Sequence, residues 1–234
     1  MCIRDSAWST SVVSNASPER NLLRLLARMK EGQQLTSSLI GDRDRSLAVK
    51  FGKHLQDACG YQFKVETDVA SSEENGDIDV LAYNTKVPSE VLIVECKAVL
   101  AADEINEVGG VAKAIAKGQK QLQKIERIFA EMDQTRRRDL FKFVDWSKVK
   151  TFHYLVLTPD SEPGPGMLLK EIPAISLNAI YDCFSDKQLK SPSRLVSRAR
   201  STPWLDNVKN SESASLPVVV NDWTFWLPAL RTAS

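Results

Sequence analysis

Apolar residues recur with two different periods along the chain, and the change of period separates predicted helices from predicted strands. Apolar residues three and four positions apart predict helices over Ser17–Gly32, Arg43–Cys59 and Val111–Ala130. Shorter runs, alternating or wholly apolar, predict strands instead. These runs are Tyr61–Val69, Asp77–Tyr83, Val91–Lys97, Thr151–Leu157 and Ile172–Leu177.

The order of these elements predicts an α/β fold. A short turn containing Pro88 separates Asp77–Tyr83 from Val91–Lys97, so the two strands are expected to form a hairpin. The second of them opens with the run VLIV, which is apolar on both faces, as in a central buried strand. A short helix over Asn178–Phe184 follows the last strand. We predict a mixed central sheet with helices on both faces and the order α-β-β-β-α-β.

Changes in residue composition and pattern along the chain predict four segments. The first six residues, MCIRDS, resemble a translated sequencing adapter, so 1–16 is expected to be a disordered or artefactual terminus of a longer protein. An N-terminal helix and connector are expected over 17–42, and the core domain over 43–184. The remainder, 185–234, is predicted to be a basic extension that contains a linker and one terminal strand.

The composition of the 234 residues is that of an ordinary globular domain, with 43% hydrophobic and 26% charged residues. The 31 Lys and Arg residues nearly balance the 30 Asp and Glu residues, so net charge gives no argument for a nucleic-acid partner. No apolar run is long enough to span a bilayer, and the four cysteines form no CxxC pair. We therefore expect a cytoplasmic protein with reduced thiols and no membrane span.

Charged residues cluster at the ends of the predicted hairpin strands. Strand alternation places Asp77 and Asp79 on one face, and Glu95 and Lys97 on one face. If the strands pair, Asp79, Glu95 and Lys97 meet, and buried charges cost several kcal/mol each unless they are paired or bind a metal. Two carboxylates suit Mg²⁺, and an ammonium group beside them can stabilise a phosphoryl transition state. Metal-assisted phosphodiester hydrolysis fits these groups.

The segment GDIDVLAY followed by VLIVECKA resembles the PD-(D/E)xK nuclease superfamily, which has the restriction-endonuclease-like fold. The resemblance covers roughly 43–184 and implies Mg²⁺-dependent cleavage of nucleic acid, usually DNA, with Mn²⁺ as a substitute. It implies that Asp79 and Glu95 hold the metal and that the backbone carbonyl of Cys96 completes the coordination. Lys97 would serve the attacking water.

The helix before the first strand weakens this resemblance, whereas the helix after the hairpin extends it. Many members carry a glutamate on the helix before the first strand, but RSLAVKFGKHLQDAC contains none. Asp42 or Asp44 is a possible replacement, although an acid favoured by the dipole at a helix start is the preferred interpretation. In relatives, a glutamine on the helix after the hairpin borders the active site. Gln121 in KGQKQL is therefore a candidate catalytic residue, with simple helix filler as the alternative.

The sequence leaves three alternatives to a DNA endonuclease. Asp79, Glu95 and Lys97 can be a salt-bridged strand end without chemistry. The domain can also be a catalytically idle nuclease-fold module that binds nucleic acid or a protein partner. RNA cleavage is the third alternative. Among these alternatives, we expect a Mg²⁺-dependent deoxyribonuclease that forms the C-terminal module of a larger defence or repair protein.

Overall fold

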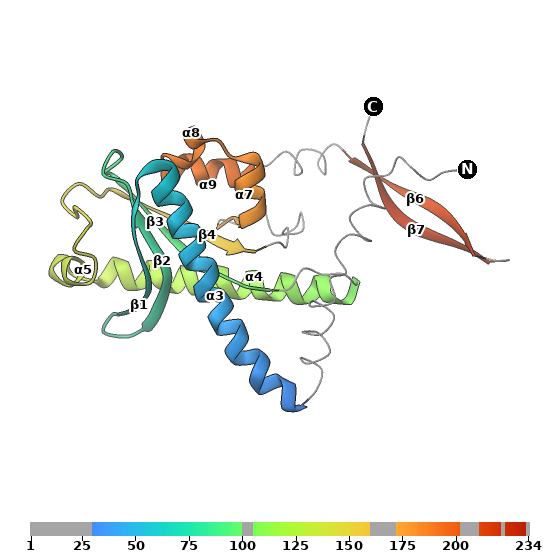
Figure 1. The fold of residues 1–234 in the computed structure, drawn as a ribbon, viewed down its shortest axis with the longest axis horizontal. Helices are drawn as coiled ribbons and strands as arrows, with labels where there is room; N and C mark the ends of the chain where they lie inside the picture. Colours follow the sequence, from blue (N-terminus) through green and yellow to red (C-terminus); the bar gives the residue numbers. More distant parts are fainter. Residues whose placement is uncertain (1–29, 100–104, 160–171, 202–210, 221–222, 233–234) are drawn as a thin grey trace.

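The computed structural model describes residues 30–99, 105–159, 172–201, 211–220 and 223–232 (Figure 1). The predicted terminus over 1–16 and most of the predicted helix Ser17–Gly32 lie outside these residues.

The helix that precedes the sheet, α3 (Lys30–Cys59), is longer than predicted. It passes through Gly32, where the sequence predicts a helix end, so that prediction is wrong. One glycine costs a helix about 1 kcal/mol relative to alanine, which a helix of 30 residues can absorb. The end at Cys59 is confirmed, because Gly60 follows with φ +73°, the left-handed conformation that ends many helices.

The sheet has five strands in the spatial order β1-β2-β3-β4-β5. The β1–β2 and β2–β3 pairs are antiparallel, whereas the β3–β4 and β4–β5 pairs are parallel. The predicted hairpin and the predicted mixed sheet are both confirmed. The strands are β1 (Gln62–Ala70), β2 (Asn75–Tyr83), β3 (Glu90–Cys96), β4 (Thr151–Thr158) and β5 (Ala174–Ser176).

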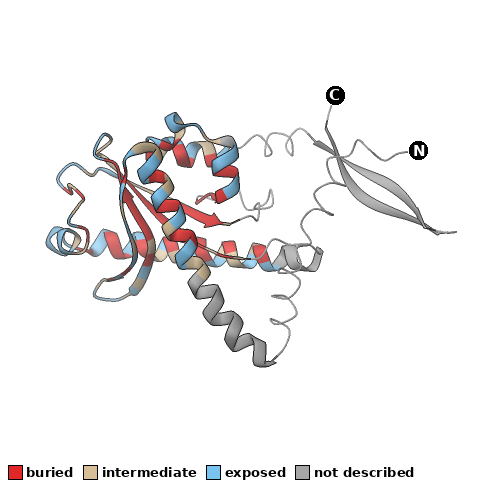
Figure 2. Ribbon diagram, in the orientation of Figure 1, coloured by how far each residue is buried: buried red, intermediate tan, exposed pale blue. Residues whose placement is uncertain are grey.

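Helices cover both faces of the sheet, and the strands between them are the most buried part of the fold (Figure 2). The other helices of the folded body are α4 (Ile105–Glu131), α5 (Gln134–Leu140), α7 (Leu177–Cys183), α8 (Asp186–Leu189) and α9 (Pro192–Arg200). On one face, Phe51 of α3 packs in the same core as Leu92 of β3, together with residues of α7–α9. On the other face, Leu122 of α4 packs in a core with Ile93 of β3. An α/β fold with a mixed sheet flanked by helices is thus confirmed.

The helix α5 has no counterpart among the predicted elements. Its sequence, QTRRRDL, has no apolar period, and none of its residues is buried. The side chain of Asp133 caps it by accepting a hydrogen bond from the backbone N–H of Arg136. Local capping rather than core packing therefore starts this helix.

The folded body continues beyond residue 184, where the sequence predicts a domain boundary. The short helices α8 and α9 bury Leu189, Leu195 and Ala199 in the core that α3 shares with the sheet. Basic residues outnumber apolar ones here, which hides the narrow apolar stripe in the sequence. None of the helices in the described ranges is long and apolar enough to cross a membrane.

The C-terminal segment contains two strands rather than one. The strands β6 (Ser211–Val220) and β7 (Trp223–Thr232) form an antiparallel two-stranded sheet separate from the main one. The small polar residues of 210–215, NSESAS, predict a linker, but from Ser211 onward this stretch belongs to β6, so that prediction is wrong. The stretch gives no apolar alternation, so only pairing with β7 reveals it as a strand.

Candidate active site

The candidate site lies where β2 and β3 part. The two strands are paired up to Val80 and Val94, and their pairing stops there, while β3 stays paired with β4 through Cys96. Asp79 and Glu95 are the next residues on the two strands. In the opening, Oδ2 of Asp79 accepts a hydrogen bond of 2.6 Å from the backbone N–H of Cys96. A side chain thus takes the place of a strand partner at this point.

Strand alternation breaks at Asp79. Ile78 packs in the core on the α4 side of the sheet, but Val80 packs in the core on the α3 side. Opposite this point, Glu66 of β1 has φ 48°, a left-handed conformation that is unusual for a residue other than glycine. The expectation that alternation alone puts Asp77 and Asp79 on one face therefore fails, although Asp79 still reaches the site.

Glu95 and Lys97 form the centre of the site. Lys97 Nζ donates a hydrogen bond to Glu95 Oε1, and the two side chains form an ion pair. Glu95 is only 1% exposed, and its second oxygen, Oε2, is buried without a hydrogen-bond partner among the described residues. The predicted meeting of Asp79, Glu95 and Lys97 therefore leaves one buried carboxylate oxygen unsatisfied, which is costly unless a cation or donor reaches it.

Close packing of α4 fixes the other wall of the site. A Cβ atom at Gly118 would lie 3.3 Å from Cγ of Glu95 and 3.4 Å from Cε of Lys97. A side chain here would press on both members of the ion pair, so glycine permits the close approach of helix and strand. The sequence places Gly118 on the buried face of this helix, but it does not show which side chains meet it there.

The two glutamines beside Gly118 have different surroundings. Gln119 is buried, and its Nε2 donates a 2.7 Å hydrogen bond to the backbone carbonyl of Ile172, so it supports the fold. Gln121 is half-buried, and its Oε1 is buried without a hydrogen-bond partner in the described part of the chain. It lies three residues after Gly118 and thus on a neighbouring part of the same helix face. Gln121 remains the candidate of the two.

Asp44 also belongs to this region. Its Oδ1 accepts a hydrogen bond from the backbone N–H of Ala98, the residue after Lys97. Since α3 begins at Lys30, Asp44 is not at a helix start, and the interpretation of this acid as a dipole-stabilising residue is wrong. The side chain of Asp42 lies outside the described part of the structure.

The carboxyl groups of Asp79 and Glu95 and the ammonium group of Lys97 influence one another strongly. Burial raises the pKa of Asp79 to about 6, against the opposing effects of the Cys96 N–H and of Lys97. Burial, and next the charge of Asp79, raise the pKa of Glu95 to about 8. Burial by itself would lower the pKa of Lys97, but its contact with Glu95 outweighs this and raises it. The site therefore holds protons at pH values where free carboxyl groups have lost them.

Cys96 contributes only its backbone. Its side chain is fully buried in the core on the α3 side of the sheet, and burial raises the pKa of the thiol well above its ordinary value. A protonated, buried thiol is a poor metal ligand or nucleophile. The predicted role of Cys96 through its carbonyl therefore does not conflict with its buried side chain.

The donor set suits a hard divalent cation. Within the described residues, no group of three His, Cys, Asp or Glu side chains forms a ready metal cage. Mg²⁺ does not need one, because it keeps several waters and takes one or two protein carboxylates. Asp79 and Glu95 supply two such groups, and the unpartnered Oε2 of Glu95 is a free, buried oxygen donor. The residues present thus fit Mg²⁺.

Comparison with known proteins gives no match: no protein-family model fits this chain, and no curated protein matches its sequence.

Proposed function

We propose that this chain is a Mg²⁺-dependent nuclease of the PD-(D/E)xK type, with a restriction-endonuclease-like core, that hydrolyses phosphodiester bonds of DNA. The observation that carries the proposal is the convergence of Asp79, Glu95 and Lys97 at the point where β2 and β3 part. A purely structural ion pair does not account for the second, unpartnered oxygen of Glu95. Strongly raised carboxyl pKa values in such a cluster are typical of functional sites.

Each of the three side chains has a distinct role in this proposal. Asp79 and Glu95 would hold Mg²⁺ together with the Cys96 carbonyl, and the cation would lower the pKa of a water molecule and offset phosphate charge. Lys97 has no lone pair when charged, so it cannot be a ligand. Its ammonium group would instead orient the attacking water and stabilise the negative charge that develops on the phosphate.

The reaction is a hydrolysis. The water oxygen forms a bond to phosphorus, the bond from phosphorus to the leaving sugar oxygen breaks, and that oxygen takes up a proton. Asp44 would act as a positioning residue, because its hydrogen bond to the N–H of Ala98 fixes the backbone next to Lys97. Gln121, on the α4 face beside Gly118, would contact the substrate or the attacking water.

One observation favours a second candidate function, a catalytically idle nuclease-fold module that binds nucleic acid or a protein. The direct contact between Lys97 and Glu95 compensates both charges without a metal. In that case, duplex binding would be independent of divalent cations and would not lead to cleavage.

Plasmid cleavage separates the two functions. The full chain is incubated with supercoiled plasmid in Mg²⁺, in Mn²⁺ or in EDTA, beside Glu95→Gln and the matched control Glu126→Gln, an exposed position on α4. We expect nicked or linear DNA with the wild type and the control, and none with Glu95→Gln or in EDTA. Wild-type protein that binds the plasmid but leaves it supercoiled in both metals would favour the idle module. A parallel incubation with RNA shows which polymer is cut.

A further inference from the structure

A second feature suited to a polyanion lies on the surface of the helices α8 and α9. The two helices border a shallow hollow with a volume of about 350 Å³. Cationic side chains, hydroxyl groups and one amide line it, and none of the described lining residues is acidic. The lining includes Lys187, Gln188, Ser193, Arg194, Ser197 and Arg198.

One cation of the hollow is held in position by the fold. Arg198 donates a 2.8 Å hydrogen bond from Nη1 to the backbone carbonyl of Ser201, and its guanidinium lies 6.0 Å from the centre of the Phe184 ring. Gln188 accepts a 2.9 Å hydrogen bond from the Ser185 N–H through Oε1, which leaves its amide nitrogen as a donor. The hollow thus presents pre-positioned donors, which lower the entropy cost of binding an anion.

Two further cations line the hollow. Lys187 and Arg194 are exposed, and neither has an ion-pair partner in the described part of the chain. Over 186–200 the sequence has five Lys or Arg residues and a single acid, Asp186. Glu90 of β3, beside the first turn of α9, accepts hydrogen bonds from the Ser191 and Ser193 hydroxyls.

We infer that this hollow binds the phosphodiester backbone of duplex DNA at a distance from the cleavage site. The identity of the ligand as DNA rests on the proposed nuclease function. The three cations of the hollow, spread over two adjacent short helices, fit a chain of phosphates, and arginine forks bind phosphate oxygens well. The hollow is shallow and its lining contains no aromatic ring on which a base could stack, which disfavours a mononucleotide. Such contacts position the duplex without reading its sequence.

The helix α3 links the region of the hollow with the region of the candidate active site. Its Cys59 contacts the backbone carbonyl of Asp186 in α8, whereas its Asp44 contacts the backbone beside Lys97. Fifteen residues of helix separate these two contacts, which corresponds to about 22 Å at 1.5 Å per residue.

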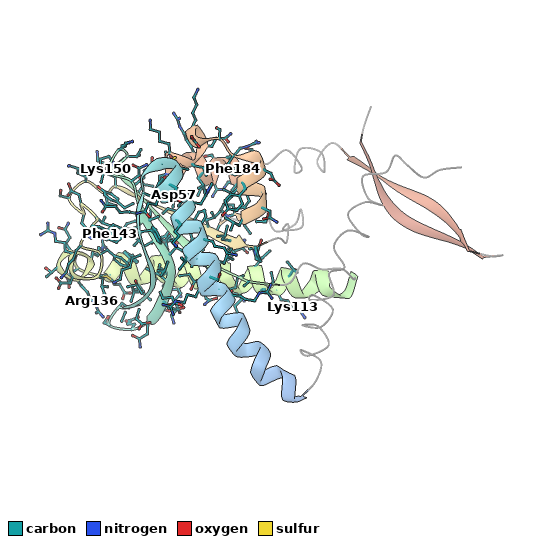
Figure 3. All side chains as sticks on the ribbon, in the orientation of Figure 1. Asp57, Lys113, Arg136, Phe143, Lys150 and Phe184 are labelled. Carbon is teal, nitrogen blue, oxygen red and sulfur yellow. The ribbon has the colours of Figure 1, made fainter. Side chains whose placement is uncertain are left out.

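Duplex affinity tests the inference directly. Binding of the full chain to a fluorescent duplex of about 30 base pairs is followed by anisotropy in EDTA, where no cleavage occurs, over a series of salt concentrations. The test variant is Lys187→Gln/Arg194→Gln. The control is Arg136→Gln/Arg138→Gln, which removes two equally exposed cations from α5; Figure 3 shows Arg136 there, well away from Phe184 beside the hollow.

We expect the hollow variant to bind about tenfold more weakly and its salt dependence to fall by roughly two released ions, since two phosphate contacts are lost. The control should stay within about twofold of the wild type, because long-range charge effects are screened by salt. Thermal melting of all the proteins checks whether these surface changes leave the fold intact. Equal affinity losses in both double variants, or none in either, would overturn the inference.

Two further arms separate this inference from the proposed function and from another anionic partner. If the hollow variant loses duplex affinity but the wild type cuts neither DNA nor RNA in Mg²⁺ or Mn²⁺, the nuclease proposal fails and the hollow stands. If cleavage occurs and the hollow variant binds like the wild type, the hollow fails and the nuclease stands. If the variant loses binding to phosphatidylserine vesicles but not to the duplex, the hollow is a membrane-binding surface and the inference is wrong.

Discussion

The carboxylate of Asp44 accepts a hydrogen bond from the backbone N–H of Ala98, 54 positions further along the chain. The contact joins the middle of α3 to the end of β3, directly beside Lys97. A partly buried acid in the middle of a helix has no capping role, and here it adds negative charge to the site that contains Asp79 and Glu95.

Two substitutions of Asp44 separate its hydrogen bond from its charge. Asp44→Asn keeps an oxygen acceptor for the Ala98 N–H, whereas Asp44→Ala leaves that group unpaired at a cost of about 1–3 kcal/mol. We expect only Asp44→Ala to melt at a clearly lower temperature. Plasmid cleavage should fall in Asp44→Ala, which no longer fixes the backbone beside Lys97, and stay near the wild-type rate in Asp44→Asn, which keeps the hydrogen bond. An equal loss of cleavage in Asp44→Asn would show that the negative charge of Asp44, rather than its hydrogen bond, serves the site.

Gly118 should be sensitive to the smallest possible enlargement. In Gly118→Ala the new methyl group would press on Glu95 and Lys97, so we expect cleavage to fall while the fold is retained. Gly110→Ala is the matched control on the same helix, because a Cβ there meets nothing within 4 Å. The control should gain up to about 1 kcal/mol of stability from better helix propensity and cut at the wild-type rate. Equal cleavage by both variants would show that α4 does not shape the site.

Gln121 and Gln123 provide a matched pair on α4. Gln123 is exposed, whereas Gln121 is half-buried with an unpartnered carbonyl oxygen on the side of the helix next to Gly118. We expect Gln121→Ala to reduce the single-turnover cleavage rate and Gln123→Ala to leave it unchanged. Both should melt like the wild type, since neither residue fills the core. Identical rates for the two variants would make Gln121 a helix residue without a role in the site.

The metal-free protein should lose stability as pH rises. Glu95 has an ordinary pKa of 4.5 and one of about 8 in the fold, and the values for Asp79 are 3.8 and about 6. At these two groups the folded state therefore holds more protons than the unfolded state between about pH 4 and pH 8, so their contribution to the free energy of unfolding falls across this window. Urea unfolding in EDTA at a series of pH values measures this.

Glu95→Gln is the control for that pH dependence, because it removes the titration of Glu95 while other groups still titrate. Its stability should fall less steeply with pH than that of the wild type. Mg²⁺ should restore stability to the wild type at pH 8, because it binds the deprotonated carboxylates of the folded state. Parallel pH profiles for the wild type and Glu95→Gln would contradict the raised pKa of Glu95.

The sequence predicts the central part of this fold because local patterns decide it. The apolar run before Glu95 fits only a buried strand, and the short turn at Pro88 brings the preceding strand beside it. These two features are enough to bring Asp79 close to Glu95. The buried face of α4, including Gly118 and Leu122, also follows from a regular helical period.

The remaining features depend on contacts between distant segments. The break in alternation at Asp79 arises from the parting of two strands and from the unusual backbone of Glu66, which no local pattern indicates. The role of Asp44 depends on a contact with Ala98 across the fold. The helix α9 has a strongly basic sequence, and only packing reveals that Leu195 belongs to the main core.

The most direct test of the account is the single-turnover cleavage rate of supercoiled plasmid by Lys97→Ala beside the wild type, at Mg²⁺ concentrations that calorimetry shows to saturate both proteins. The variant keeps both carboxylates, so it should still bind the metal, but it lacks the charge that stabilises the transition state. The account predicts cleavage by the wild type and a rate lower by on the order of a hundredfold in the variant. Equal rates would make Lys97 only the ion-pair partner of Glu95, and the absence of any cleavage by the wild type would contradict the nuclease proposal itself.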